Sequence, residues 1–274
     1  MQFDEGSYFM KVVILAGGVG SRLREISKGV PKPMIEIGGR PILWHIMSHY
    51  AKFGLNEFII CLGYKGHVIK DFFVNYSLHN SNIEVKLDTG HVEILERDQE
   101  NWSVKLIDTG QETMTGGRIK RLEKIIGNET FCMTYGDALS NVNISDLMLS
   151  HQRAGKLATV TAVVPQGRFG VLSIDASNSV NSFVEKPTDS NSMINGGFFV
   201  LEPGIFSRIS GDEVSFEQGP LNLLSKDNQL NAFIHRDFWQ CMDTPRDWEL
   251  LEKLVSSGNP PWRTQVATVS ASEL

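Results

Sequence analysis

The apolar positions predict buried strands joined through helices. Residues 11–16 (KVVILA) are apolar from Val12 onward up to Gly17, and residues 58–62 (FIICL) form a second apolar run. Such runs are typical of strands covered on both faces, as in a parallel sheet. Residues 41–50 (PILWHIMSHY) between them are typical of a helix with proline in its first turn. This order indicates a βαβ unit, whose ligands bind at the carboxyl ends of the strands.

Other apolar runs extend this architecture. We expect further strands at residues 130–135, 158–164, 171–174, 180–183 and 198–201, and an amphipathic helix at 245–254. The predicted fold class is α/β: a mixed but mostly parallel sheet flanked by helices, with an elaborated C-terminal part.

Residues 83–107 show a different pattern, because apolar and polar residues alternate there. Period-two alternation is typical of half-exposed antiparallel strands, so a hairpin insertion is expected at about residues 80–112. The Asp-Thr-Gly triplets at 88–90 and 108–110 resemble those of aspartic proteases, but the segment between them is too short to build two lobes. Both triplets are therefore interpreted as hairpin turns of the insertion.

One continuous domain is predicted from the absence of repeats, low-complexity tracts and linker-like segments. It spans residues 10–263, between an N-terminal extension (1–9) and a flexible tail (264–274).

Composition and charge exclude several classes of protein. The net charge of −6 and the lack of a basic run argue against nucleic acid as a partner. The three cysteines are isolated, so neither a zinc site nor a disulfide framework is indicated, which suits the cytoplasm. No stretch approaches the ~20 apolar residues of a membrane helix, and no membrane partner is expected.

The loop after the first strand, residues 15–23 (LAGGVGSRL), is a candidate phosphate loop, because glycines let backbone amides converge on phosphate. It fits neither the dinucleotide-binding fingerprint nor the Walker A motif. Its distinctive feature is a pair of cations: Arg22 at its end, and Lys32 between two prolines.

Two aspartates are candidate Mg²⁺ ligands. Asp137 follows the strand that ends at Tyr135, and Asp243 precedes the helix that begins near Pro245. Carboxylates suit Mg²⁺ in a phosphate site. Each position also has a local explanation, since Asp137 is suited to a turn and Asp243 or Thr244 to a helix N-cap.

Taken together, LAGGVGSRL and the following PKPM (residues 31–34) resemble the signature of the sugar-1-phosphate nucleotidylyltransferases. Residues 37–47, 114–121, 167–170, 193–199 and 239–247 resemble the glucose-1-phosphate cytidylyltransferase branch of that family, so the resemblance covers about residues 10–263.

This resemblance implies a Rossmann-like fold whose C-terminal part binds sugar. It also implies an enzyme that transfers CMP from CTP to α-D-glucose 1-phosphate and releases CDP-glucose and pyrophosphate, with Mg²⁺ as cofactor. It implies a homo-oligomer, possibly a hexamer, that supplies nucleotide sugars for surface polysaccharide. The residues that it assigns to the nucleotide are Leu15, Gly17, Gly18, Ser21, Arg22, Lys32, Gly116, Gly117 and Arg118. Catalysis is assigned to Arg22, Lys32, Asp137 and Asp243, of which both aspartates hold the metal, and the sugar phosphate to Gly170, Glu185, Lys186 and Asn195.

These residue types fit the chemistry. A phosphate monoester is already anionic at neutral pH, so its in-line attack on the α-phosphorus needs cations and alignment instead of a general base. Accordingly, no Ser/His/Asp or Cys/His constellation accompanies the loop.

Two positions depart from the family pattern, which has glycine after Gly136-Asp137 and aspartate three residues further on. Ala138 and Asn141 stand there in this chain. We expect the Ala138 Cβ to crowd the metal or the sugar phosphate, and Asn141 to remove a charge.

Two other hypotheses stay open at this point. The same chemistry with another sugar 1-phosphate, or with UTP or dTTP, is compatible with the motifs. The second hypothesis is a non-catalytic, regulatory protein that binds nucleotide sugars. Such proteins usually lose the residues that correspond to Lys32, Asp137 or Asp243.

Overall fold

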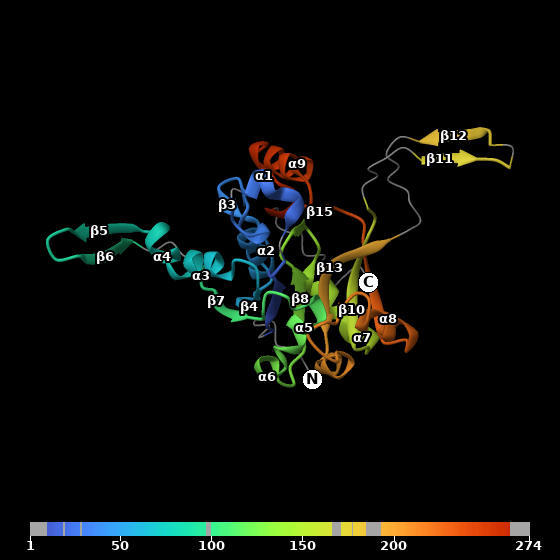
Figure 1. Cartoon of the computed structure of the whole chain (residues 1–274), viewed down its shortest axis with the longest axis horizontal. Helices are drawn as coiled ribbons and strands as arrows, with labels where there is room; N and C mark the ends of the chain where they lie inside the picture. The colour runs from blue at the N-terminus through green and yellow to red at the C-terminus, as the bar shows by residue number, and fades with distance from the viewer. Residues whose placement is uncertain are drawn as a thin grey trace, which may run out of the picture.

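A seven-stranded sheet forms the centre of the molecule, in the order β14-β10-β13-β8-β1-β4-β7 (Figure 1). The computed structural model describes residues 10–18, 20–27, 29–96, 100–165, 171–176, 178–184 and 193–263. The central strands are β1 (Val12–Leu15), β4 (Glu57–Leu62), β7 (Ser103–Asp108), β8 (Phe131–Tyr135), β10 (Ala158–Val163), β13 (Ile194–Leu201) and β14 (Leu230–His235). Only the pairs that include β13 are antiparallel within this sheet. The predicted mixed, mostly parallel α/β fold is confirmed.

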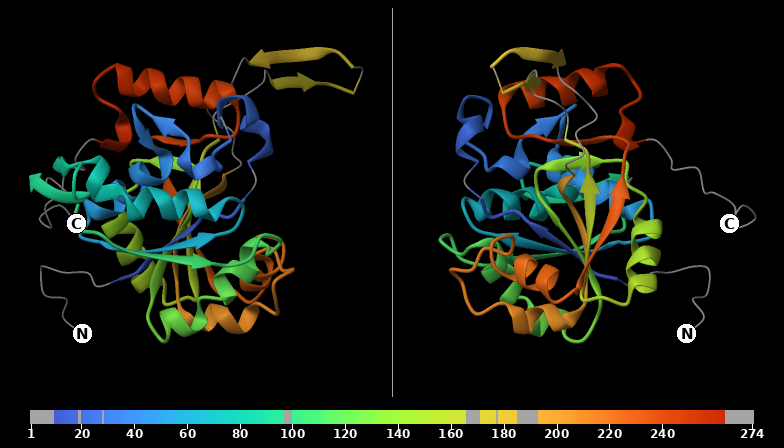
Figure 2. Two further views of the ribbon diagram at one scale, coloured as in Figure 1. Left: turned by 60° about the vertical axis from the view of Figure 1, so that its left-hand side comes forward. Right: turned by 90° about the vertical axis from the view of Figure 1, so that its right-hand side faces the viewer.

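Helices cover both faces of the sheet (Figure 2). Val12 and Ile14 of β1 pack into one core with α2 (Ile42–Ala51) and α7 (Ile144–Ala154). Alternate residues of the same strand pack on the other face, against α5 (Thr115–Lys120), α6 (Glu123–Ile126) and α8 (Pro220–Lys226). A strand buried on both faces needs an apolar residue at every position, which explains the unbroken VVIL run.

Short elements complete the chain around this frame. The remaining helices are α1 (Arg24–Ser27), α3 (Gly66–Val74), α4 (Tyr76–His79), α9 (Pro245–Ser256) and the 3₁₀ turns η1 (Ser21–Leu23), η2 (Lys32–Met34), η3 (Pro203–Arg208) and η4 (Pro261–Arg263). Four two-stranded ladders pair β2 (Glu36–Ile37) with β3 (Arg40–Pro41), β5 (Asn82–Lys86) with β6 (His91–Glu96), β9 (Ala138–Ser140) with β15 (Trp239–Cys241), and β11 (Val171–Ile174) with β12 (Val180–Val184).

The hairpin insertion is shorter than the alternating pattern predicts. The β5–β6 hairpin stands away from the body (Figure 1), and Asp88–Gly90 form its turn as expected. Residues 103–108, in contrast, are not part of it, because β7 pairs in parallel with β4 as the edge of the main sheet. The second triplet therefore ends an edge strand and is not a hairpin turn. An edge strand is only half covered, so its period-two pattern resembles that of a hairpin strand.

Within the described residues, no helix has the length and apolar character that crossing a membrane requires.

Candidate active site

The glycine-rich loop leaves the carboxyl end of β1 and lies against two basic side chains. A Cβ on Gly17 would come within 2.3 Å of the Arg118 Cζ. Gly20 has a φ of +61°, and a Cβ there would lie 2.8 Å from the Lys32 Cβ. A side chain at position 17 would displace the Arg118 guanidinium, and position 20 also has a backbone conformation that favours glycine, so the loop backbone approaches Arg118 and Lys32 closely.

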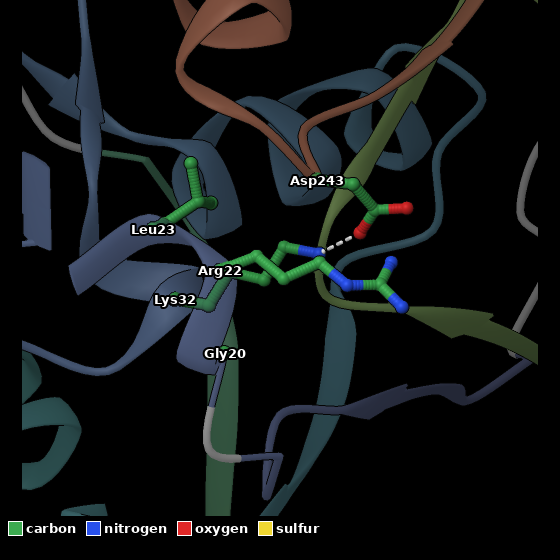
Figure 3. Close-up of a pocket in the computed structure, with 5 residues that line it drawn as sticks. All are labelled: Gly20, Arg22, Leu23, Lys32 and Asp243. Atoms are coloured by element: carbon green, nitrogen blue, oxygen red, sulfur yellow. Dashed lines mark hydrogen bonds and ion pairs between the residues drawn. The ribbon is translucent and has the colours of Figure 1, made fainter.

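Lys32 lies at the centre of the site. Pro31 and Pro33 flank it, and η2 holds it where its Nζ donates to Asp137 Oδ2 at 2.7 Å and to Asp243 Oδ1 at 2.5 Å (Figure 3 shows the second contact). Burial by itself lowers the pKa of Lys32, but the two carboxylates outweigh burial and raise the pKa above 10.5. Lys32 is therefore a cation at neutral pH.

A short ladder brings the two aspartates together. Asp137 directly precedes β9 and Asp243 follows β15, and these two strands pair with Ala138 opposite Cys241. The Met242 amide also donates to the Asp137 carbonyl at 2.8 Å. The backbone thus fixes both carboxylates on the same lysine, although 105 and 211 residues separate them from Lys32 in the chain.

The N-cap of α9 is Thr244, which leaves the Asp243 carboxylate outside the cap. The Thr244 hydroxyl accepts from the Asp247 amide, and the Asp247 carboxylate accepts from the Thr244 amide, forming a capping box. Burial alone raises the pKa of Asp243, but the Lys32 ammonium outweighs burial and holds this pKa below 3.8. Asp243 is therefore an anion that faces the loop.

Two adjoining cavities surround Lys32. One, of about 230 Å³, is lined by Gly20, Arg22, Leu23, Lys32 and Asp243, and Figure 3 shows the Arg22 and Lys32 side chains lying next to each other. The other, of about 380 Å³, is lined by Leu15, Ala16, Gly17, Gly18, Gly20, Lys32, Pro33, Thr113, Met114, Thr115, Arg118, Tyr135, Gly136, Asp137, Ser215 and Glu217. Because both share Gly20 and Lys32, a phosphate chain along the loop would reach both cavities.

Arg118 is buried and its guanidinium is occupied by the protein. It donates to five acceptors: the carbonyls of Leu62 (3.0 Å), Gly110 (2.8 Å), Gln111 (3.2 Å) and Gly17 (3.4 Å), and the Thr109 hydroxyl (2.8 Å). These acceptors come from the glycine loop and from the ends of β4 and β7. Arg118 therefore joins three loops at the edge of the sheet, and it also lines the larger cavity.

Gly116 and Gly117 lie beside the cavity lining and pack against the chain around residues 212–216. A Cβ on Gly116 would lie 2.6 Å from the Val214 carbonyl oxygen, and one on Gly117 would lie 2.5 Å from the Asp212 Cα. The part of this motif that lines the cavity is Thr113, Met114, Thr115 and Arg118. The two glycines bring α5 against that segment, and their contact with nucleotide stays a prediction.

Sequence reasoning missed a half-buried carboxylate, that of Glu217, in the larger cavity. Glu217 accepts from three hydroxyls, those of Thr115 (2.6 Å), Tyr135 (2.7 Å) and Ser215 (2.7 Å). Burial alone raises the pKa of Glu217, but these bonds outweigh burial and lower the pKa below 4.5. No motif identifies Glu217, because its partners are scattered along the chain.

Of the expected sugar-binding residues, the described part of the chain includes Asn195. Its amide donates to the Tyr135 hydroxyl at 3.1 Å, which links it to the Glu217 cluster. Gly170, Glu185 and Lys186 lie outside the described residues, as does the side chain of Ser21.

The two unusual positions have local explanations. Ala138 is buried in β9, within the ladder that aligns the aspartates. Asn141 donates from its side chain to the Asp237 carboxylate at 2.8 Å. An aspartate at position 141 would place two like charges together, so asparagine suits this environment.

The donor set around Lys32 fits a divalent cation held jointly by protein and substrate. Among the described residues, no group of three or more His, Cys, Asp or Glu side chains converges as a metal cage. Asp137 and Asp243 do converge on one cationic group, the Lys32 ammonium. Mg²⁺ bound to nucleotides usually takes one or two carboxylates and completes its shell with phosphate and water. Two carboxylates beside a phosphate loop satisfy that requirement.

Comparisons with known proteins agree with this geometry. Residues 11–247 match the nucleotidyl transferase family. The chain is 49% identical to the glucose-1-phosphate cytidylyltransferase of Salmonella typhi over 93% of this chain and 99% of that protein. It is 42% identical to the probable glucose-1-phosphate cytidylyltransferase of Bacillus subtilis over the same shares. The crystal structure of HddC from Yersinia pseudotuberculosis superposes with a TM-score of 0.64 at 27% identity, over 89% of this chain and 99% of that one. The chain belongs to the nucleotidyl transferase family, among its glucose-1-phosphate cytidylyltransferases.

Proposed function

We propose that this protein transfers the cytidylyl group of CTP to α-D-glucose 1-phosphate. A phosphate oxygen of the sugar phosphate attacks the α-phosphorus of CTP, the bond from that phosphorus to the bridging oxygen breaks, and pyrophosphate leaves. The products are CDP-glucose and pyrophosphate. The observation that carries this proposal is the convergence of Lys32, Asp137 and Asp243 beside the glycine loop, in a chain that is 49% identical to a glucose-1-phosphate cytidylyltransferase.

In this proposal the chain supplies positive charge and alignment. Lys32 and Arg22 line the same cavity, so both can neutralise a triphosphate that lies along the loop. The attacking oxygen is already ionised, and catalysis depends on holding it in line with the bond that breaks. Fixed cations stabilise the charge that moves onto the leaving pyrophosphate.

Asp137 and Asp243 are the residues that would hold Mg²⁺. When bound, the metal would supply further positive charge at the phosphates. Lys32 would then exchange its carboxylate contacts for contacts with the anionic substrate.

The larger cavity is the proposed nucleotide pocket. Leu15, Gly17, Gly18, Thr113 and Arg118 line it, together with Tyr135 and Glu217. Glu217 accepts from the Tyr135 hydroxyl, which in turn accepts from the Asn195 amide. We propose that the sugar lies toward Asn195, and its contacts with Gly170, Glu185 and Lys186 remain predictions. We also propose a cytoplasmic location, because Cys61, Cys132 and Cys241 are thiols that form no disulfide.

A substrate matrix tests this function. CTP, UTP, dTTP, ATP and GTP are each incubated with glucose 1-phosphate and Mg²⁺, pyrophosphate release is followed, and the product is identified by mass. We expect CDP-glucose, with CTP strongly preferred. Faster turnover of UTP or dTTP would contradict the base assignment. If the folded protein, with Lys32, Asp137 and Asp243 in place, turned over none of these nucleotides, the result would favour another sugar 1-phosphate or the regulatory hypothesis.

A further inference from the structure

Glu217 and Asn195 are connected through the hydroxyl of Tyr135. This hydroxyl donates its proton to Glu217 Oε1 at 2.7 Å, and its oxygen accepts from Asn195 Nδ2 at 3.1 Å. Glu217 and Tyr135 line the larger cavity, whereas Asn195 is an expected sugar-binding residue. The Tyr135 hydroxyl therefore links the proposed nucleotide pocket to the side on which we place the sugar.

Glu217 fixes the direction of the Tyr135 proton. Its other oxygen, Oε2, accepts from the hydroxyls of Thr115 and Ser215, each of which in turn accepts from a backbone amide. Burial alone raises the pKa of Glu217, but its three hydroxyl donors outweigh burial and hold this pKa below 4.5. Burial and the Glu217 carboxylate both raise the pKa of Tyr135. At neutral pH Glu217 can therefore only accept, and the proton between the two side chains belongs to Tyr135.

The same hydrogen bonds fix which way the Asn195 amide group faces. Its Oδ1 accepts from the Gly197 amide at 2.9 Å, and its Nδ2 donates to Tyr135. A flipped amide group would place its NH₂ against the Gly197 N–H and its oxygen against the Tyr135 oxygen, whose proton is already donated to Glu217. Neither contact would be a hydrogen bond, so Asn195 has one favoured orientation.

The backbone next to Asn195 is also held in place. In the main sheet β13 pairs with β10 at this position, and the Trp239 indole donates to the Gly196 carbonyl at 2.7 Å. Gly197 has a φ of +75°, and a Cβ there would lie 3.2 Å from the Tyr135 ring. This glycine lets β13 pass close to Tyr135. With the backbone held, the direction in which the Asn195 amide points depends on its hydrogen bonds.

One proton of the Asn195 amide is left for a substrate. An asparagine amide carries two protons, and Tyr135 accepts one of them. Within the described part of the chain, the side chain of Asn195 donates to Tyr135 alone, and the residue is exposed. A substrate that reaches Asn195 therefore meets a hydrogen-bond donor, and the oxygens of a sugar phosphate can accept from it.

We propose that Glu217 is a positioning residue for the sugar phosphate. Glu217 accepts the Tyr135 proton, the Tyr135 oxygen accepts one proton of Asn195, and Asn195 donates its other proton to an oxygen of the sugar 1-phosphate. Glu217 thus acts through Tyr135 and Asn195 without touching the sugar. This inference rests on the proposed cytidylyl transfer and extends it, because it names the side chains that orient the contact with the sugar.

Two variants break successive links of this chain of bonds. Tyr135→Phe removes the hydroxyl, and Glu217→Gln keeps the size of the side chain but removes the charge that directs the Tyr135 proton. We expect each variant to raise the KM for glucose 1-phosphate about 10-fold, the scale of one hydrogen bond lost from a substrate. The KM for CTP should stay within about 2-fold of that of the unmodified protein, since a general loss of structure would affect both substrates. Each KM is measured by pyrophosphate release with the other substrate and Mg²⁺ at saturation.

Thr130→Val is the matched control. Thr130 directly precedes β8, the strand that Tyr135 ends, and its hydroxyl donates to the Glu202 carboxylate at 3.0 Å. The substitution removes a comparable bond between a hydroxyl and a carboxylate at the opposite end of the same strand. We expect both KM values of Thr130→Val to equal those of the unmodified protein, and urea titration compares the stability of all variants.

The double variant distinguishes one chain of bonds from two independent contacts. Residues that act in series are not additive, so Glu217→Gln combined with Tyr135→Phe should raise the KM for glucose 1-phosphate no further than Tyr135→Phe does alone. An additive rise, to about 100-fold, would overturn the proposal.

An unchanged KM for glucose 1-phosphate in either single variant would also overturn the proposal, and so would an equal rise in the KM for CTP. In these cases the unmodified protein still makes CDP-glucose, and only the positioning role is refuted. If the unmodified protein makes no CDP-glucose, the proposed function fails and the positioning role fails with it.

Discussion

Asp243→Asn separates catalysis from stability at the centre of the site. The asparagine keeps the size of the side chain and can still accept a hydrogen bond from Lys32, but it removes one of the two carboxylates. The β9–β15 ladder and the Thr244 cap hold this segment through other atoms, so the fold should persist.

The expected effect of Asp243→Asn on stability is small, and its expected effect on turnover is large. Asp243 retains 34% of its side-chain exposure, and a partly exposed ion pair contributes about 1 kcal/mol or less. In a protein of this length, 1 kcal/mol corresponds to a shift in Tm of about 2–4 °C. Loss of a preorganised charged group that acts on the reacting phosphates lowers kcat about 100- to 1,000-fold. We therefore expect near-normal unfolding with very low turnover and a higher Mg²⁺ requirement.

Thr244→Ala is the matched control, since losing an N-cap costs about 1 kcal/mol and lowers the Tm by a similar few degrees. Pyrophosphate release is measured for both variants while MgCl₂ is titrated at saturating CTP and glucose 1-phosphate, and thermal unfolding is followed by circular dichroism. Thr244→Ala should keep its turnover. If Asp243→Asn turned over normally with an unchanged Mg²⁺ dependence, the assignment of Asp243 as a metal ligand would be wrong.

Further predictions concern the residues that hold the site together and the pH dependence of the protein's stability. Arg118→Met removes the charged donor whose five hydrogen bonds join three loops, so urea titration should show a loss of about 2–4 kcal/mol in unfolding free energy, whereas an unchanged unfolding midpoint would contradict its role in joining the loops. Tyr135→Phe removes one of the three donors to Glu217, and the same titration should show a loss of about 1–3 kcal/mol. The pKa of Asp243 is lowered in the folded state, so its stabilising contribution is present above pH 3.8 and is lost as the pH falls through the folded-state pKa. Acid titration of Asp243→Asn should therefore show a shallower loss of stability than the unmodified protein, and identical curves would contradict the ion pair.

The pattern of apolar residues predicted the central fold, because burial in the core requires apolar side chains at those positions. The VVIL run of β1 is apolar at every position since cores lie on both faces, and the helix after Pro41 follows from its spacing. Strand partners were harder to predict. β7 has the alternation of a hairpin strand and nevertheless pairs in parallel with β4, because half-burial at a sheet edge produces the same pattern.

Sequence motifs predicted the charged residues at the centre of the site, but they did not predict the residues that hold the surrounding loops in place. Lys32 lies in a motif with two prolines, and the structure places its ammonium on both predicted aspartates. Arg118 also belongs to a motif, yet its five contacts are mostly with backbone carbonyls, which leave no trace in residue identity. Glu217 depends on hydroxyls from three separate segments, so no spacing could reveal it.

Asp137 suited a turn and Asp243 suited a helix N-cap, and the hydrogen bonds show whether either carboxylate is used in that way. A helix start before Pro245 needs one cap, and Thr244 with Asp247 supplies it, so the Asp243 side chain is not required there. At Asp137 the backbone carbonyl makes the structural contact, with the Met242 amide, and the carboxylate is left for Lys32. In both cases the backbone or a neighbouring residue makes the structural hydrogen bond, while the carboxylate binds the half-buried Lys32 ammonium. Two carboxylates that the fold does not need for its turns, held on one lysine beside a glycine loop, indicate a site built to bind charge.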